Sequence, residues 1–194
     1  MKLDALAVLM KSWSQQTHPR LFQHTLPAQA EQSPKMMAHW LSHLQNFFFC
    51  SIIRPWSHSL SHSFISEPRL FLIDWSSIQD HALRLKNFVA SHLFKSIFFW
   101  NEFYNIQASL FYLQDTRHRI VDFLVTKQNR PWLLIHVDPD STNRLNPALP
   151  YFHRVLQTTH ALQLAPNIQH VDCDFRAIRV PKIFPLTSFL SQLV

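Results

Sequence analysis

The sequence predicts an α/β fold in which helices flank a mixed sheet, preceded by a small, mostly helical N-terminal segment. Three observations lead to this prediction. The chain has 194 residues, 47% of them hydrophobic, which is enough to bury a core. Two apolar stretches flank a short polar turn within residues 119–138, as in paired strands. Apolar residues at helical spacing lie before and after them, at 80–100 and 147–157, an order typical of α/β proteins.

The N-terminal segment, residues 1–66, is expected to contain two helices. Apolar side chains recur at helical spacing from Leu3 to Trp13. A second helix is expected to begin at Ser33-Pro34, because serine caps helices and proline suits their first turn. It should run to about Gln45. Its outward face is predicted to carry Lys35, His39 and His43.

Hydrophobic periodicity and turn residues predict the elements that follow. Glu67-Pro68 marks the start of a second domain, residues 67–194. The first domain should end with a strand at 47–53 and a polar loop at 57–63. The second should contain strands at 70–75, 109–113, 119–126, 131–138, 161–164 and 171–173, and helices at 80–100, 147–157 and 185–193.

The paired strands at the centre of this domain carry polar side chains inside apolar runs. Side chains alternate across a strand, so Asp122 should share a face with Ile120 and Leu124. A buried acid must be hydrogen-bonded, paired or bound to a cation, because an unpaired buried charge is very costly. The shared face of the second strand is expected to carry Trp132, Leu134, His136 and Asp138.

The chain contains no glycine, where about 7% is usual. A Gly-x-x-x-x-Gly-Lys phosphate loop is therefore absent, and we expect no ATP site in this chain. Other residues must supply the left-handed backbone that turns require, and Asn129 in the central turn is suited to this.

Charge and cysteine content limit the classes of protein that fit. The net charge of +6 permits contact with nucleic acid. The two cysteines form no Cys-x-x-Cys pair, the N-terminus lacks a signal-peptide pattern, and the apolar runs are too short to span a bilayer. We therefore expect a cytoplasmic protein without a membrane partner.

Eight segments, taken in order, resemble the C-terminal region of a family of bacterial and archaeal AAA-type ATPases. That region is a winged-helix segment followed by an uncharacterised domain similar to the PD-(D/E)xK nuclease fold, and the ATPase part has no counterpart in this chain. The matching segments are Ser33–Leu41, Glu67–Ser76, Asn87–Lys95, Phe99–Trp100, Val121–Thr126, Pro131–Trp132, Ala148–Phe152 and Phe189–Leu193.

The resemblance implies a winged-helix-like segment over residues 1–66 and a restriction-endonuclease-like mixed sheet over residues 67–194. It also implies an active site with an acid on the first helix, an acid on the second strand and Glu-x-Lys on the third. The helix position holds Lys86, the strand acid is Asp122, and the third position reads His136-Val137-Asp138. Lys86 is expected to pair with Asp122 or Asp138 in an inactive site.

The leading functional hypothesis is a non-catalytic module that binds DNA or a protein partner such as an intact ATPase. DNA would meet the helix face that carries Lys35, His39 and His43. One alternative is a metal-dependent nuclease in which Asp122, His136 and Asp138 are catalytic and hold a divalent cation. Imidazole with carboxylates suits Mn, Fe or Zn better than Mg. Another alternative is a decayed ATPase fragment without activity.

Overall fold

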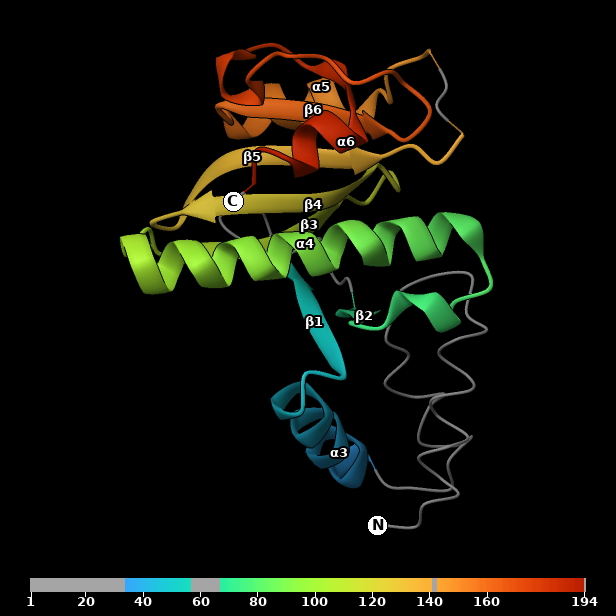
Figure 1. The fold of residues 1–194 in the computed structure, drawn as a ribbon. Helices are drawn as coiled ribbons and strands as arrows, with labels where there is room; N and C mark the ends of the chain where they lie inside the picture. Colours follow the sequence, from blue (N-terminus) through green and yellow to red (C-terminus); the bar gives the residue numbers. More distant parts are fainter. Residues whose placement is uncertain (1–33, 57–66, 141–142, 194) are drawn as a thin grey trace. The chain divides into compact units, whose positions relative to one another are not determined.

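The computed structural model describes residues 34–56, 67–140 and 143–193, which form a mixed α/β fold (Figure 1). The predicted helix at Leu3–Trp13 and the predicted loop at 57–63 lie outside the described residues.

The chain divides into two compact units. Unit 1 comprises residues 1–54 and 67–91, and unit 2 comprises residues 55–66 and 92–194. This division differs from the predicted one between residues 66 and 67. The reason is strand pairing, since β2 (Arg69–Leu72) is antiparallel to β1 (Cys50–Pro55), with Ile52 opposite Leu70.

Unit 1 is built on the helix α3 (Pro34–Asn46), which begins and ends close to the predicted residues. The described part of its buried face carries Trp40 and Leu41. They pack with residues of β1 and β2 and with the start of α4 (His81–Tyr104). The unit's buried cluster comprises Trp40, Leu41, Cys50, Leu70, Leu72, Ile78 and Leu83, and a 3-10 helix, η1 (Trp75–Ser77), lies between β2 and α4.

The strand β1 begins at Cys50 and not at Phe47, which corrects the sequence prediction. Phe48 has a positive φ of 54°, a conformation incompatible with a strand. The side chains of Phe47 and Phe48 are 80% and 78% exposed. Their apolar character suggested a strand, but they form the turn that follows α3.

The helix α4 contributes residues to both units. Asp80 caps it, because the Asp80 carboxylate accepts a hydrogen bond of 2.7 Å from the Leu83 amide. The helix continues one turn beyond the predicted end, to Tyr104. Asn101 fixes the chain that follows, since its side chain accepts from the Ala108 amide and donates to the Ala108 carbonyl.

Unit 2 contains a five-stranded mixed sheet in the order β3-β4-β5-β6-β7. The β3/β4 and β4/β5 pairs are antiparallel, and the β5/β6 and β6/β7 pairs are parallel. Its elements are β3 (Ala108–Gln114), β4 (Ile120–Lys127), β5 (Arg130–Val137), α5 (Ala148–Leu156), β6 (His160–Ala165), the 3-10 helix η2 (Phe175–Ala177), β7 (Lys182–Pro185) and α6 (Leu186–Leu190).

The C-terminal part of the domain differs from the prediction. Residues 171–173, expected to form a strand, do not, and the last strand is β7. The final helix is shorter than expected. A strand as short as β7 carries too little period-two pattern to be distinguished from a loop in the sequence.

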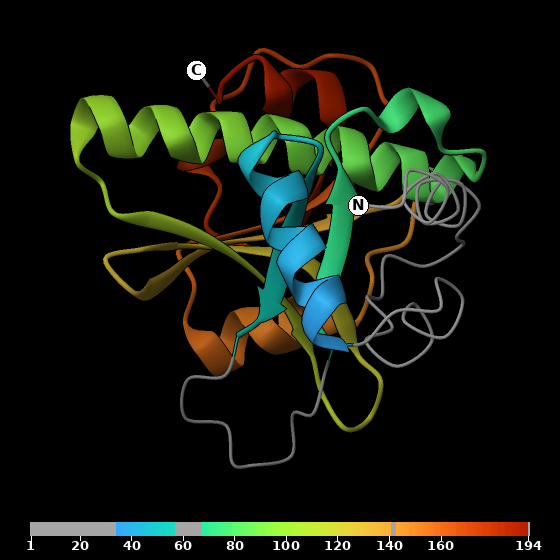
Figure 2. The same cartoon turned by 90° about the horizontal axis from the view of Figure 1, so that it is seen from below.

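Helices cover both faces of the unit 2 sheet. Figure 2 shows α5 on one face, with α6 and the unit 2 part of α4 on the other. Leu124, Leu134 and Ala161 pack with Phe152 of α5 in one buried cluster. A two-residue turn at Gln128 and Asn129, both with positive φ, joins β4 to β5.

Trp132 does not share a face with Leu134, which corrects the predicted alternation. The β4/β5 register shifts between Val125 and Thr126, so an irregularity interrupts the pleat. Leu134 packs in the cluster under α5. The Trp132 ring instead contacts Trp100 of α4, with ring centroids 6.0 Å apart.

Within the part of the chain that the structure describes, no helix combines the length and the apolar character needed to cross a bilayer.

Candidate functional site

Asp122 and His136 lie side by side, on the neighbouring strands β4 and β5. The Asp122 side chain is 2% exposed, and its Oδ2 atom lies 2.9 Å from the Nδ1 atom of His136. The same oxygen accepts a hydrogen bond of 2.9 Å from the Val137 amide. The prediction that an acid in this strand would be hydrogen-bonded or paired is confirmed.

The contact of His136 with Asn146 indicates which ring nitrogen of His136 carries the proton. The Asn146 Nδ2 atom lies 2.9 Å from His136 Nε2, while the Asn146 Oδ1 atom accepts from the Ala148 amide at the start of α5. Because the oxygen is held by this amide, the nitrogen donates to His136, and Nε2 accepts. The proton of the neutral ring is therefore on Nδ1, facing Asp122.

The contact between His136 and Asp122 is close but not in line. The buried Nδ1 atom of His136 makes no hydrogen bond of good geometry, although Asp122 Oδ2 is only 2.9 Å away. We treat the contact as an electrostatic one, since the distance is short and the alignment is poor. The lone pair of Nε2 is used by Asn146, so neither ring nitrogen is available to a metal ion without rearrangement.

Asp138 is held by a different partner, Gln163 of β6. The Gln163 Nε2 atom donates to Asp138 Oδ2 at 3.0 Å and to the Arg144 carbonyl at 3.0 Å. The Gln163 Oε1 atom accepts from the Asn146 amide at 2.7 Å. Gln163 thus joins the segment that follows β5 to the start of α5, and it links Asp138 to the residue that holds His136.

We call the five side chains Asp122, His136, Asp138, Asn146 and Gln163 the polar cluster. Sequence reasoning missed Asn146 and Gln163. The only signal was Gln163 among the apolar residues 161–165 of β6, and its side chain is 1% exposed. A buried amide needs partners, and here it supplies them to a carboxylate and to two backbone groups.

The described residues contain no group of three His, Cys, Asp or Glu side chains that could hold a metal ion. Asp122 and His136 form a close pair. Asp138 is linked to this pair through Gln163 and Asn146. Lys86 belongs to unit 1 and the two acids belong to unit 2, so its pairing with them stays a prediction.

The three residues predicted to meet DNA lie on the exposed side of α3. Lys35, His39 and His43 are all exposed, as the helical spacing predicted. The Nε2 atoms of His39 and His43 lie 3.0 Å apart, one helical turn from each other. This face combines one lysine with two imidazole rings, so its charge is modest when the histidines are neutral.

No protein-family model, no curated protein and no solved structure matches this chain.

Proposed function

We propose that this protein is a non-catalytic binding module, similar to the C-terminal region of the AAA-type ATPases named above, with a nuclease-type site that has become structural. The observation that carries this proposal is the polar cluster, in which Asp122, His136 and Asp138 are engaged by neighbouring protein groups. The element order α4-β3-β4-β5-α5-β6 supports the nuclease-like interpretation of the fold.

The chemistry of phosphodiester hydrolysis argues against an active site here. Such hydrolysis requires an activated water and positive charge near the reacting phosphate, commonly supplied by a divalent cation with a lysine. The lysine of the Glu-x-Lys pattern is replaced by Asp138. The lone pair with which His136 could bind a metal is already shared with Asn146.

A cleavage assay tests the absence of catalysis. We expect no cutting of plasmid or of single-stranded DNA with Mn²⁺, Mg²⁺ or Zn²⁺. Cleavage that requires Mn²⁺ and disappears in Asp122→Ala, but persists in the matched variant Asp140→Ala, would establish the nuclease alternative. Asp140 is exposed and lies in the segment that follows β5.

DNA is the proposed partner because the exposed face of α3 carries Lys35, His39 and His43 and the whole chain carries a net charge of +6. Cations on an exposed helix neutralise phosphates and release counterions. The affinity for a short duplex should therefore fall steeply with salt concentration.

Fluorescence anisotropy with a labelled duplex, measured over a salt series, tests this partner. Lys35→Ala should weaken binding and reduce the salt slope by about 1. The matched control is Lys95→Ala, an exposed lysine of α4 in unit 2, which should leave the slope unchanged. An absence of binding at low salt would reject DNA and leave a protein partner, such as an intact ATPase, as the module's target.

A further inference from the structure

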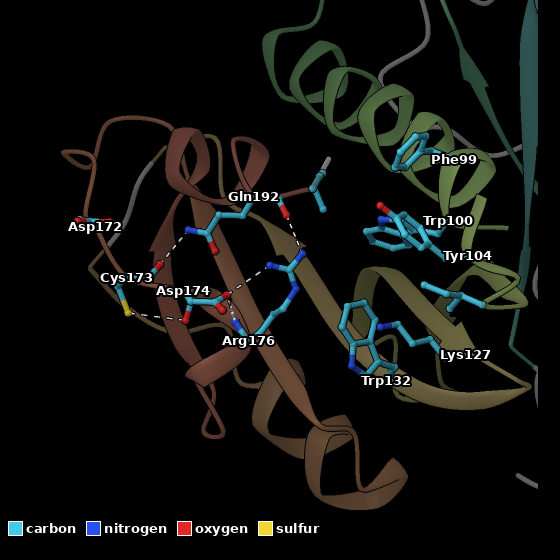
Figure 3. A pocket seen from close by; sticks show the side chains of 12 residues that line it. Phe99, Trp100, Tyr104, Lys127, Trp132, Asp172, Cys173, Asp174, Arg176 and Gln192 are labelled. Carbon is cyan, nitrogen blue, oxygen red and sulfur yellow. Dashed lines mark hydrogen bonds and ion pairs between the residues drawn. The ribbon is translucent and has the colours of Figure 1, made fainter. Parts of the chain in front are cut away.

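A pocket of about 650 Å³ lies in unit 2, away from the polar cluster. Figure 3 shows its side chains converging from three parts of the unit. Trp100 and Tyr104 come from the end of α4, Lys127 and Trp132 from β4 and β5, and Arg176 from η2. The volume is in the range of pockets that hold small organic molecules.

The ammonium of Lys127 is the most unusual group in this pocket. Its Nζ atom lies 3.4 Å from the centroid of the Trp132 ring and 5.8 Å from that of Trp100. Among the described residues it has these two ring contacts and no carboxylate or hydrogen-bond partner. Indole rings attract a cation, but they do not neutralise its charge, so Lys127 is a half-buried cation with no described anion in contact with it.

A second cation lies near the first. Burial lowers the pKa of Lys127 below its usual value, and the positive charge of Arg176 lowers it further. An anion between the two side chains would relieve both effects, since it would restore a charge partner to Lys127 and screen its repulsion from Arg176.

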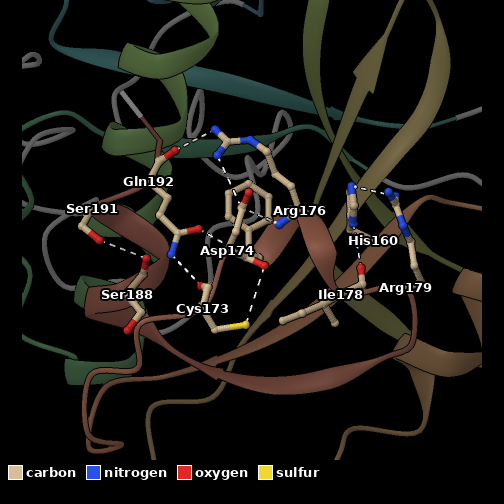
Figure 4. A network of polar contacts seen from close by, with 10 residues as sticks. His160, Cys173, Asp174, Arg176, Ile178, Arg179, Ser188, Ser191 and Gln192 are labelled. Atoms are coloured by element: carbon tan, nitrogen blue, oxygen red, sulfur yellow. Dashed lines mark hydrogen bonds and ion pairs between the residues drawn. The ribbon is translucent and has the colours of Figure 1, made fainter.

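The wall that carries Arg176 is held in place before any ligand enters. The Gln192 Oε1 atom accepts from the Phe175 amide and its Nε2 atom donates to the Cys173 carbonyl, both at 2.9 Å. The Gln192 carbonyl accepts from Arg176 at 2.8 Å, and Figure 4 shows this network. A site with a fixed wall loses less conformational freedom when it binds.

The acids of the pocket limit how much negative charge it can accept. Asp174 lies 3.5 Å from the Arg176 guanidinium and caps η2 by accepting from the Arg176 amide. Asp172 also lines the pocket. Asp174 pairs with Arg176, so Lys127 remains for one anionic group, and the further carboxylate of Asp172 in the lining disfavours a polyanion.

The aromatic side chains indicate the other part of the ligand. The Tyr104 side chain is 65% exposed, and Trp100 and Trp132 meet edge to face at an interplanar angle of 84°. An exposed tyrosine ring can bind a flat ring by stacking, as aromatic side chains do with nucleobases.

We propose that this pocket binds a small organic molecule that joins one anionic group to a flat aromatic ring, with the anion against Lys127 and Arg176 and the ring against Tyr104. The proposal goes beyond the binding module described above, because it assigns a small-molecule site in unit 2 that is separate from the DNA face of α3.

Isothermal titration of the full chain with four probes tests the ligand class. Adenosine monophosphate and 1-naphthoate carry both features, whereas adenosine carries only the ring and inorganic phosphate only the anion. We expect at least one of the first two to bind about 10-fold or more tightly than adenosine and phosphate. The proposal is overturned if neither of the two binds at millimolar concentration, or if adenosine or phosphate binds equally well.

The variant Lys127→Met tests the site itself, because it keeps an unbranched side chain over Trp132 and removes the charge. Affinity for the tighter probe should fall about 10-fold or more, while Lys182→Met, an exposed lysine of β7, should bind as the unchanged protein does. Equal affinity in Lys127→Met and Lys182→Met would place the ligand elsewhere and refute the assignment. The four-probe comparison needs no variant and stands even if Lys127→Met fails to fold.

Discussion

A single buried imidazole, His160 of β6, illustrates how side-chain environment sets stability. Its Nδ1 atom donates to the Ile178 carbonyl at 2.8 Å, and the ring packs against Trp132 at 5.5 Å. Burial lowers the pKa of His160 below its usual 6.5. The Ile178 hydrogen bond offsets part of this, and the charges of Arg179 and Lys127 lower the pKa further. The folded protein therefore favours the neutral form of this ring more than the unfolded chain does.

The sign of the resulting pH dependence is fixed. Unfolded chains take up the proton below about pH 6.5, so the contribution of His160 is fully present above that pH and is lost as the pH falls toward the lowered folded value. We expect the unfolding free energy, and with it the urea midpoint, to decrease as the pH is lowered from 7.5 to 5.5. His160→Asn should flatten this dependence, and His170→Asn, at an exposed position, should not. Equal pH profiles in all three proteins would contradict the assignment.

The Asp122 carboxylate should matter for stability even without catalysis. Asp122→Ala leaves the Val137 amide without its acceptor and removes the charge in contact with the His136 ring, which should cost about 3 kcal/mol of unfolding free energy. Replacing both Asp122 and His136 by leucine should cost less than the sum of the single leucine changes, because the two polar groups are removed together. Urea denaturation measures both, and additive costs would show that the contact contributes nothing.

At the scale of one element, the turn between β4 and β5 shows how a chain without glycine makes hairpins. Gln128 and Asn129 both have positive φ, 50° and 60°, the geometry for which Asn-Gly is the preferred pair. The left-handed conformation costs a residue with a Cβ roughly 1 to 2 kcal/mol, although glycine also loses more freedom on folding.

The double change Gln128→Asn with Asn129→Gly should therefore stabilise the protein by about 0.5 to 1 kcal/mol. Thermal and urea unfolding measure the difference. The control introduces glycine where φ is helical, at the exposed Glu102 of α4. That change should destabilise by about 1 kcal/mol. Destabilisation by both changes would mean that the turn backbone is not strained.

At the scale of the whole molecule, each of the two units is built from two stretches of chain that are separated in the sequence. Local sequence patterns do not reveal this arrangement. Unit 1 draws on residues before and after the 55–66 stretch, which belongs to unit 2. A fragment of residues 67–194 would therefore remove β1 from β2 and would take Trp40 and Leu41 away from Leu70 and Leu72.

We expect this fragment to aggregate, because it exposes a strand edge and an apolar surface that the full chain covers. Size-exclusion chromatography with light scattering, compared with the full chain at equal concentration, provides the test. A monomeric fragment that melts cooperatively at the same temperature would show instead that residues 67–194 fold independently, as the sequence-based division assumed.

Sequence reasoning predicted the elements whose signal is local. The helix α4 and the strands β4 and β5 follow from the periodicity of their apolar residues. The face on which Trp132 lies was predicted wrongly, because one irregularity in the pleat transfers a side chain to the other face of the sheet. Such an irregularity depends on tertiary packing more than on local residue type.

The candidate site was predicted only in part, and the missing part has a physical cause. The proximity of Asp122 and His136 could be predicted from strand alternation, since the two residues lie on adjacent strands. Asn146 and Gln163 reach the cluster from a loop and from a strand with parallel pairing to β5. Contacts between elements distant in sequence leave no periodic signal, and the pocket around Lys127 is a product of three such elements.

The two thiols of the protein differ in exposure, so that one of them can be labelled selectively. Cys50 is 1% exposed, and burial raises its pKa to about 11, so its reactive thiolate is scarce at neutral pH. Cys173 is exposed and lines the pocket in unit 2. A maleimide dye should therefore label Cys173 alone in the folded protein and Cys50 only after denaturation, which mass spectrometry of the labelled peptides would verify. The native chain would thus carry one fluorophore at the pocket's edge without any engineered residue.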